Sequence, residues 1–302
     1  IPKRDWSSDV CSSDLLAALS AGAFLHAQSL PALSPGVREA AWFPDGARIV
    51  VSLYDQLWTM TPDGKDAKRL GLTGAAFTAE RDPAVTPDGK SIVFAGERDG
   101  HFDLWRVPVT GGATTAVTND DGDERWPSVL ADGRVVFAHR APHGTWRLES
   151  TVAGGFGPGA DRKTGPTGVR TDAPVILTTG EAAEWRPRVS PDGKWVAFVS
   201  NRESDNGDTD IWARELAGAT PRTVRVTRTA GAESHPAWSP DSKRIAYSAG
   251  LGPQAAIWVI QLPAQGSVGA AGAVGAAGSV QGAGFAGRGG RGGGAASDPA
   301  DA

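Results

Sequence analysis

The chain has 302 residues, of which 40 are glycine and one is cysteine, and its formal net charge is −4. This length suits one large domain or two smaller ones. The negative net charge argues against a surface for nucleic acid, and a single cysteine excludes an intrachain disulfide framework.

The first 27 residues differ in kind from the rest. Residues 1–15 resemble the in-frame translation of a sequencing-library adapter, so they are set aside in predicting the fold. Residues 16–27 are apolar, end in small side chains and are too short to span a bilayer, which is typical of the remnant of a signal peptide cleaved after Ala27. A buried helix is the alternative. We therefore expect a periplasmic or secreted protein.

A short motif recurs five times between residues 36 and 265. Each copy has an aspartate, mostly followed by glycine, and then a run of β-branched and aromatic residues. Such a turn followed by such a run predicts a β-hairpin. The spacings between successive aspartates are 43, 44, 60 and 49 residues, close to the length of a propeller blade. The aspartates are Asp45, Asp88, Asp132, Asp192 and Asp241.

Two further strands are predicted after each hairpin. The third strand of every copy is marked by a tryptophan, and a short fourth strand ends near a Leu-Thr or Val-Thr pair in several copies. Four antiparallel strands per repeat make one propeller blade. The sequence thus predicts an all-β propeller with five recognisable blades. The tryptophans, interpreted as core residues between blades with ligand stacking as the alternative, are Trp58, Trp105, Trp146, Trp212 and Trp258.

The five copies together resemble the TolB-like, or WD40-like (PD40), β-propeller repeat family over roughly residues 36–262. The resemblance implies a propeller scaffold, and a scaffold alone does not fix a function. TolB itself has an α/β domain before its propeller, whereas about ten residues separate the predicted leader from the first copy here.

Three segments depart from the repeat. Residues 149–174 are rich in Gly, Thr and Pro, and we expect a mobile loop. Residues 203–210 alternate acidic side chains but lack the glycine and the final glutamate of a calcium loop, so a solvated hairpin tip is predicted. Residues 266–302 are rich in Gly and Ala and are expected to be a disordered linker or an insertion between strands.

The fifth copy has no recognisable fourth strand, and the Gly- and Ala-rich segment begins in its place. We therefore expect the five blades to belong to a larger ring that is incomplete in this chain. An open arc, or a fifth blade of three strands, is the structure that this predicts.

Four copies carry a glutamate at the start of the predicted innermost strand, where the first copy has Val37. Innermost strands converge on one mouth of the axial channel, so glutamates there would concentrate negative potential and favour a cation or a basic peptide end. The alternative is that each glutamate accepts hydrogen bonds from backbone donors of the neighbouring blade. These residues are Glu80, Glu124, Glu184 and Glu233.

Two residues after each glutamate the side chain varies from copy to copy. A mixed aromatic and charged rim is typical of an interaction surface. We therefore predict that these positions set partner specificity. They are Asp82, Trp126, Arg186 and His235.

Motifs for catalysis are missing. The sequence has no Gly-x-Ser-x-Gly elbow and no His-Glu-x-x-His, and its five histidines are scattered. His139 and His143 lie four residues apart without an acidic partner in register, so no metal site is predicted. No cofactor is expected.

Two functions remain. The first is the propeller of a truncated secreted hydrolase, a peptidase or an amidohydrolase, whose catalytic domain would follow in the same chain. The alternative is a stand-alone TolB-like periplasmic scaffold in an envelope complex. In both, the residues present form a non-catalytic module for protein or peptide partners, without nucleic acid and without a membrane span.

Overall fold

The computed structural model describes residues 37–119, 121–152, 174–204, 207–229, 231–250 and 255–262, which all lie in one compact unit spanning residues 33–281. Every regular element in these ranges is a β-strand. No helix long and apolar enough to cross a membrane occurs in this part of the chain. The predictions for residues 1–15, 16–27 and 266–302 lie outside it, as does most of the first insertion.

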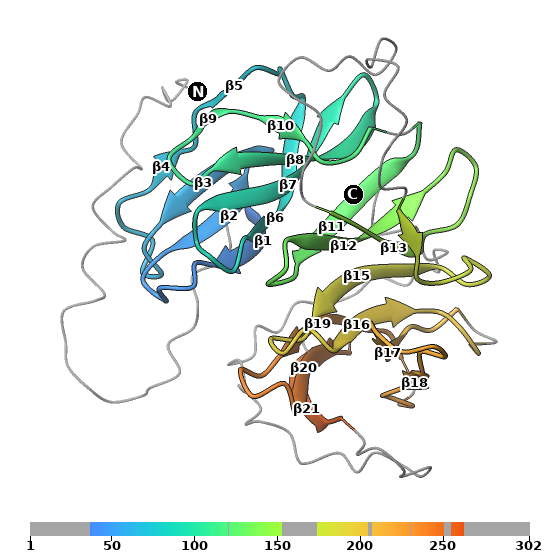
Figure 1. The fold of residues 1–302 in the computed structure, drawn as a ribbon. Coiled ribbons are helices and arrows are strands. Elements are labelled where there is room, and N and C mark those ends of the chain that lie inside the picture. Colours follow the sequence, from blue (N-terminus) through green and yellow to red (C-terminus); the bar gives the residue numbers. More distant parts are fainter. Residues whose placement is uncertain are drawn as a thin grey trace, which may run out of the picture. The chain divides into compact units, whose positions relative to one another are not determined.

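The strands form five antiparallel sheets that follow one another in chain order and are the blades of a five-bladed β-propeller (Figure 1). The first blade contains β1 (Val37–Trp42), β2 (Ile49–Leu53), β3 (Gln56–Met60) and β4 (Lys68–Arg69). The second contains β6 (Ala79–Val85), β7 (Ser91–Arg98), β8 (His101–Pro108) and β10 (Thr115–Ala116). A short parallel pair, β5 (Leu72–Thr73) with β9 (Gly112–Ala113), joins these two blades.

The third and fourth blades repeat this order. The third contains β11 (Asp123–Val129), β12 (Arg134–Arg140), β13 (Arg147–Val152) and β14 (Val175–Ile176). The fourth contains β15 (Glu184–Val189), β16 (Trp195–Ser200), β17 (Asp210–Glu215) and β18 (Thr223–Arg225). The fifth blade has three described strands, β19 (Glu233–Trp238), β20 (Arg244–Ala249) and β21 (Ala256–Gln261). The all-β propeller prediction is therefore confirmed.

The first strand of each blade contacts the first strand of the next, so β1, β6, β11, β15 and β19 are consecutive neighbours. The apolar core lies between the sheets. One cluster packs Leu57 of the first blade against Phe94 of the second, and another packs Leu104 against Phe137 of the third. Each blade is thus stabilised mainly by its neighbours, because a single sheet buries little apolar surface alone.

The predicted hairpin turns form as expected. In each, the aspartate side chain accepts a hydrogen bond from the backbone N–H two residues later, as at Asp88, where the distance to the Lys90 nitrogen is 3.0 Å. Glycine follows with a positive φ in four turns, and Ser242 takes the same conformation in the fifth with φ 58°. The fifth turn therefore tolerates a side chain where the others have none.

One tryptophan is out of register, which corrects the sequence analysis. Trp105 pairs with Phe94 and Trp212 pairs with Phe198, but in the third blade Phe137 pairs with Glu149. Trp146 lies three residues earlier, before β13 begins. Its ring instead lies beside that of Trp126, with the centroids 5.1 Å apart.

Candidate binding site at the innermost strands

All five innermost strands carry a β-bulge at the same place. The pairing of each with its neighbour shifts after the second or third residue. In four strands a proline lies within the bulge, and proline cannot donate to the ladder. The residue at the bulge has a positive φ, between 35° and 55°, although none is glycine. These residues, here called the axial cluster, are Glu39, Asp82, Trp126, Arg186 and His235.

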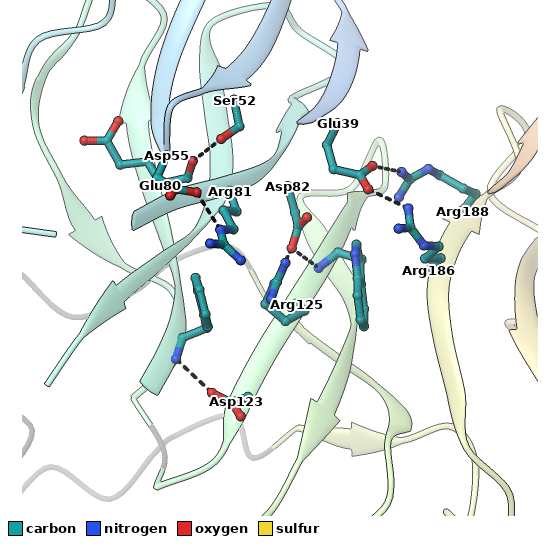
Figure 2. A network of polar contacts seen from close by, with 12 residues as sticks. Glu39, Ser52, Asp55, Glu80, Arg81, Asp82, Asp123, Arg125, Arg186 and Arg188 are labelled. Carbon is teal, nitrogen blue, oxygen red and sulfur yellow. Dashed lines mark hydrogen bonds and ion pairs between the residues drawn. The ribbon is translucent and has the colours of Figure 1, made fainter. Parts of the chain in front are cut away.

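The axial cluster brings together blades that are distant in sequence. Arg186 of the fourth blade donates to Glu39 of the first over 2.5 Å, although 147 residues separate them (Figure 2). Arg188 adds an ion pair of 3.7 Å to the other oxygen of Glu39. The guanidinium of Arg186 also lies 5.6 Å from the ring centroid of Trp126.

Asp82 pairs with the blade that follows it. Its carboxylate accepts from Nε of Arg125 at 2.5 Å and from the backbone N–H of Trp126 at 3.4 Å (Figure 2). Both side chains of this ion pair are buried, and the guanidinium lies 4.4 Å from the centroid of the Phe102 ring. The negative charge of Asp82 is therefore already neutralised by the protein.

Of the axial cluster, sequence reasoning identified four members and missed Glu39. A signal was present, because every member lies six residues before the turn aspartate of its own copy. Counting back from Asp45 reaches Glu39 in the same way. The first copy has Val37 where the other four have a glutamate, so it was not compared further, and Glu39 two residues later was missed.

The four glutamates lie elsewhere, inside the interfaces between blades. Glu124, Glu184 and Glu233 are 0% exposed and Glu80 is 5% exposed. Glu80 accepts a hydrogen bond of 2.7 Å from the backbone N–H of Leu57, which belongs to the preceding blade. Burial raises the pKa of Glu80, Glu184 and Glu233, because the charged carboxylate loses its hydration.

In later blades a threonine mediates the contact between the glutamate and the preceding blade. Thr118 accepts from the backbone N–H of Leu104 at 2.8 Å and donates to Glu124 at 3.0 Å. Thr227 accepts from Ile211 in the same way and donates to Glu233. This geometry supports the structural alternative for the glutamates and leaves the axial cluster as the candidate binding surface.

The third blade adds a buried pair to this pattern. Nδ1 of His139 lies 2.9 Å from Oε1 of Glu124. His139 therefore has the acidic neighbour that the sequence did not indicate. No group of three or more side chains suited to a metal ion occurs within the described ranges.

The axial cluster and its neighbours carry an excess of positive charge. Three guanidiniums, of Arg125, Arg186 and Arg188, face two carboxylates, of Glu39 and Asp82. The pKa of Arg188 is lowered, first because the surrounding protein partly withdraws solvent from its guanidinium and then because Arg186 repels its charge, while Glu39 opposes both.

His235 lies at the exposed side of the axial cluster. Its pKa is lowered, first because the surrounding protein withdraws solvent from the ring and then because Arg186 repels the charged form. Its Nδ1 lies 3.3 Å from the Ser248 hydroxyl.

No protein-family model matches the chain. An uncharacterised protein of Agrobacterium fabrum is 26% identical over 171 residues, which make up 54% of this chain and 52% of that protein. An uncharacterised peptidase of Bacillus subtilis is 37% identical over 83 residues, 28% of this chain and 12% of the peptidase. Dipeptidyl-peptidase 5 of Porphyromonas endodontalis is 26% identical over 241 residues, 72% of this chain and 30% of the peptidase. The chain thus spans about half of the first relative and less than a third of either peptidase.

Among solved structures, a putative TolB from Agrobacterium tumefaciens superposes with a TM-score of 0.60 at 18% identity, covering 76% of this chain and 78% of that one. TolB from Acinetobacter baumannii gives a TM-score of 0.55 at 18% identity, covering 74% and 51%. At this identity the likeness shows the fold alone. The fold is that of TolB-like propellers, and membership of the PD40 repeat family stays a prediction.

Proposed function

We propose that this chain is a non-catalytic binding module that holds a protein or peptide partner at its axial cluster, as the propeller of a secreted hydrolase. The hydrolase would be a peptidase or an amidohydrolase with its catalytic groups in another domain. Two of the relatives by sequence bear peptidase names, and this chain matches only a minor part of each, which supports a module within a larger enzyme.

The observation that carries the proposal is the diversity of the axial cluster on a repeated scaffold. Turns, buried glutamates and core positions repeat because every blade has the same packing requirements. At the bulge the backbone repeats, but the side chain is an acid, an acid, an indole, a guanidinium and an imidazole in turn. A positive φ costs a residue other than glycine about 1–2 kcal/mol, so glycine would suit the backbone better. The side chains found there link blades to one another, as in the pair of Arg186 with Glu39, and their diversity supports a further role in contacting a partner.

A stand-alone periplasmic scaffold in an envelope complex is the second candidate. It is favoured by the fold, because the likeness extends over 78% of the putative TolB. The complete reading frame of the parent gene distinguishes the two. A nucleophile elbow or a metal-binding barrel downstream selects the hydrolase, and a stop codon soon after residue 302 selects the scaffold.

The binding proposal is tested with a defined probe, a pool of N-acetylated random hexapeptides passed over the immobilised full chain. We expect peptides to be retained and the variant Arg186→Gln to reduce retention at least about tenfold, since one hydrogen-bonded charge contributes that much. Arg48→Gln is the matched control, because Arg48 is exposed and pairs with Asp45 on an outer turn at 3.0 Å. Retention no better than on a blank surface, or equal loss in both variants, would overturn the proposal.

A further inference from the structure

We propose that Arg186 of the axial cluster and the neighbouring Arg188 bind the free C-terminal carboxylate of a peptide. This inference rests on the proposed function and specifies which end of the ligand is recognised. The two arginines lie two residues apart on β15 and share the single carboxylate of Glu39 (Figure 2).

Charge favours an anionic ligand. Asp82 is paired with Arg125, and both oxygens of Glu39 are engaged by arginines. A cationic group would have to displace a guanidinium to reach either acid. A carboxylate would instead complete the unequal pairing of two guanidiniums with one acid, and a guanidinium presents a planar set of donors that matches carboxylate geometry.

Arg188 is the accessible member of the pair. Its side chain is 34% exposed, and its ion pair with Glu39 is 3.7 Å long, whereas Arg186 lies 2.5 Å from the same group. One of its nitrogens donates to the carbonyl of Pro187 at 3.1 Å, which orients the guanidinium. Arg188 therefore combines a weak ion pair within the protein with a fixed direction.

The fifth blade borders this surface. Trp238 donates from Nε1 to the backbone oxygen of Arg188 at 2.8 Å, which fixes β19 against β15 at this point. His235 on the same strand is exposed and lies close enough to Arg188 for the two charges to interact. The partly exposed guanidinium of Arg188 and the exposed His235 are therefore the parts of this surface that a chain end would meet.

The aromatic member of the axial cluster supports the arginine pair. The Trp126 ring lies 5.6 Å from the guanidinium of Arg186 and is itself buried. Contact of a guanidinium with an aromatic face limits its orientations and leaves its edge donors available. The structure thus presents the pair in a preorganised form, which reduces the entropy lost on binding.

The test compares two versions of the same random hexapeptide pool, N-acetylated in both, with free C-terminal acids in one and C-terminal amides in the other. We expect the full chain to retain acids at least about tenfold better than amides at neutral pH, which corresponds to one charge-assisted contact. Arg188→Gln should abolish this preference, and Arg134→Gln, on an exposed turn beside Asp132, should leave it intact. Free acetate serves as a competitor. Displacement of the peptides only at molar acetate supports recognition of a peptide end, and displacement at low acetate concentration would overturn it.

The outcomes separate the two proposals. Equal retention of acids and amides overturns the carboxylate inference and leaves the binding module in place. Retention of neither overturns both. Should Arg188→Gln fail to fold, as judged by its circular dichroism, Arg188→Lys keeps the charge without the planar fork and should still lower the preference for acids. An unchanged preference in that variant would overturn the role of Arg188.

Discussion

Single residues decide how blades hold together. The same glutamate, eight residues before the turn aspartate, accepts hydrogen bonds from the preceding blade in the second, third and fifth blades. In the fourth blade Glu184 interacts with Thr178 of the preceding blade and also pairs with Arg202. Each carboxylate is taken out of water, and its partners offset that cost because they donate to the charged form. The glutamates therefore exchange solvation for a specific link between neighbouring sheets.

This burial predicts a pH dependence at Glu233. Burial raises the pKa of Glu233 above 4.5, its value in the unfolded chain, so the folded chain holds this proton more tightly. The contribution of the protonated Glu233 to the unfolding free energy is therefore fully present below pH 4.5 and is lost as pH rises through the folded pKa. Glutamine cannot titrate. We expect the unfolding free energy of the native chain to fall relative to that of Glu233→Gln between pH 4 and pH 7, measured by urea denaturation. The exposed Glu181→Gln is the control, and parallel pH profiles for the native chain and Glu233→Gln would contradict the prediction.

At the scale of elements, the hairpin turns and the bulges have opposite requirements for side chains. Four turns place glycine at a positive φ, where a Cβ would be strained. The bulges place five other residues in the same region of backbone space. In the turn, glycine itself makes the positive φ favourable. In the bulge, the paired strand residues before and after it impose the positive φ on a residue other than glycine.

Gly46 tests the turn. Its φ is +66°, and a Cβ at this position would meet nothing within 4 Å, so only the backbone conformation opposes a side chain. Gly46→Ala should lower the free energy of unfolding by about 1 kcal/mol. Gly71 is equally open without a positive φ, so Gly71→Ala should be neutral or slightly stabilising. Equal losses in the two variants, read from denaturation midpoints, would contradict the role of the positive φ.

At the scale of the whole molecule, each blade covers the third strand of the one before it. The aliphatic residues at one equivalent position, Leu57, Leu104, Leu148 and Ile211, are 0% exposed, but Ile257 of the fifth blade is 57% exposed. On the first blade Trp42 is 60% exposed, whereas its equivalent Trp238 packs against the fourth blade. Within the described part of the chain, the two outermost faces therefore lack the cover that every inner face has, and the larger ring stays a prediction.

This difference predicts unequal costs for the same deletion. Leu104→Ala should lower the free energy of unfolding by about 2–5 kcal/mol, because the branched end of a buried side chain is removed and a cavity is left. Ile257→Ala should cost less than about 1 kcal/mol, since its side chain is already in contact with water. Urea denaturation of both variants measures the two costs. A cost at Ile257 as large as that at Leu104 would mean that the fifth face is covered in solution.

The sequence by itself determined the blades. Turn residues, strand residues and their fivefold repetition are local signals, and local signals suffice because each hairpin is formed by residues close together in the chain. The bulge positions can also be found from the sequence, because each lies six residues before a turn aspartate, although Glu39 was overlooked. Trp146 was misplaced because tryptophan was taken as the marker of the third strand, whereas the pairing with Phe137 selects Glu149.

Only the tertiary structure decided which polar residues meet and which are hidden. The glutamates and the axial cluster lie two residues apart in the same strand, and sequence spacing cannot tell the channel side from the interface between blades. The bulge makes that distinction by turning one side chain toward residues of other blades, as at Arg186, while the glutamate remains packed against the preceding blade. The contact of Arg186 with Glu39 spans 147 residues, so it exists only because the sheets bring their innermost strands together.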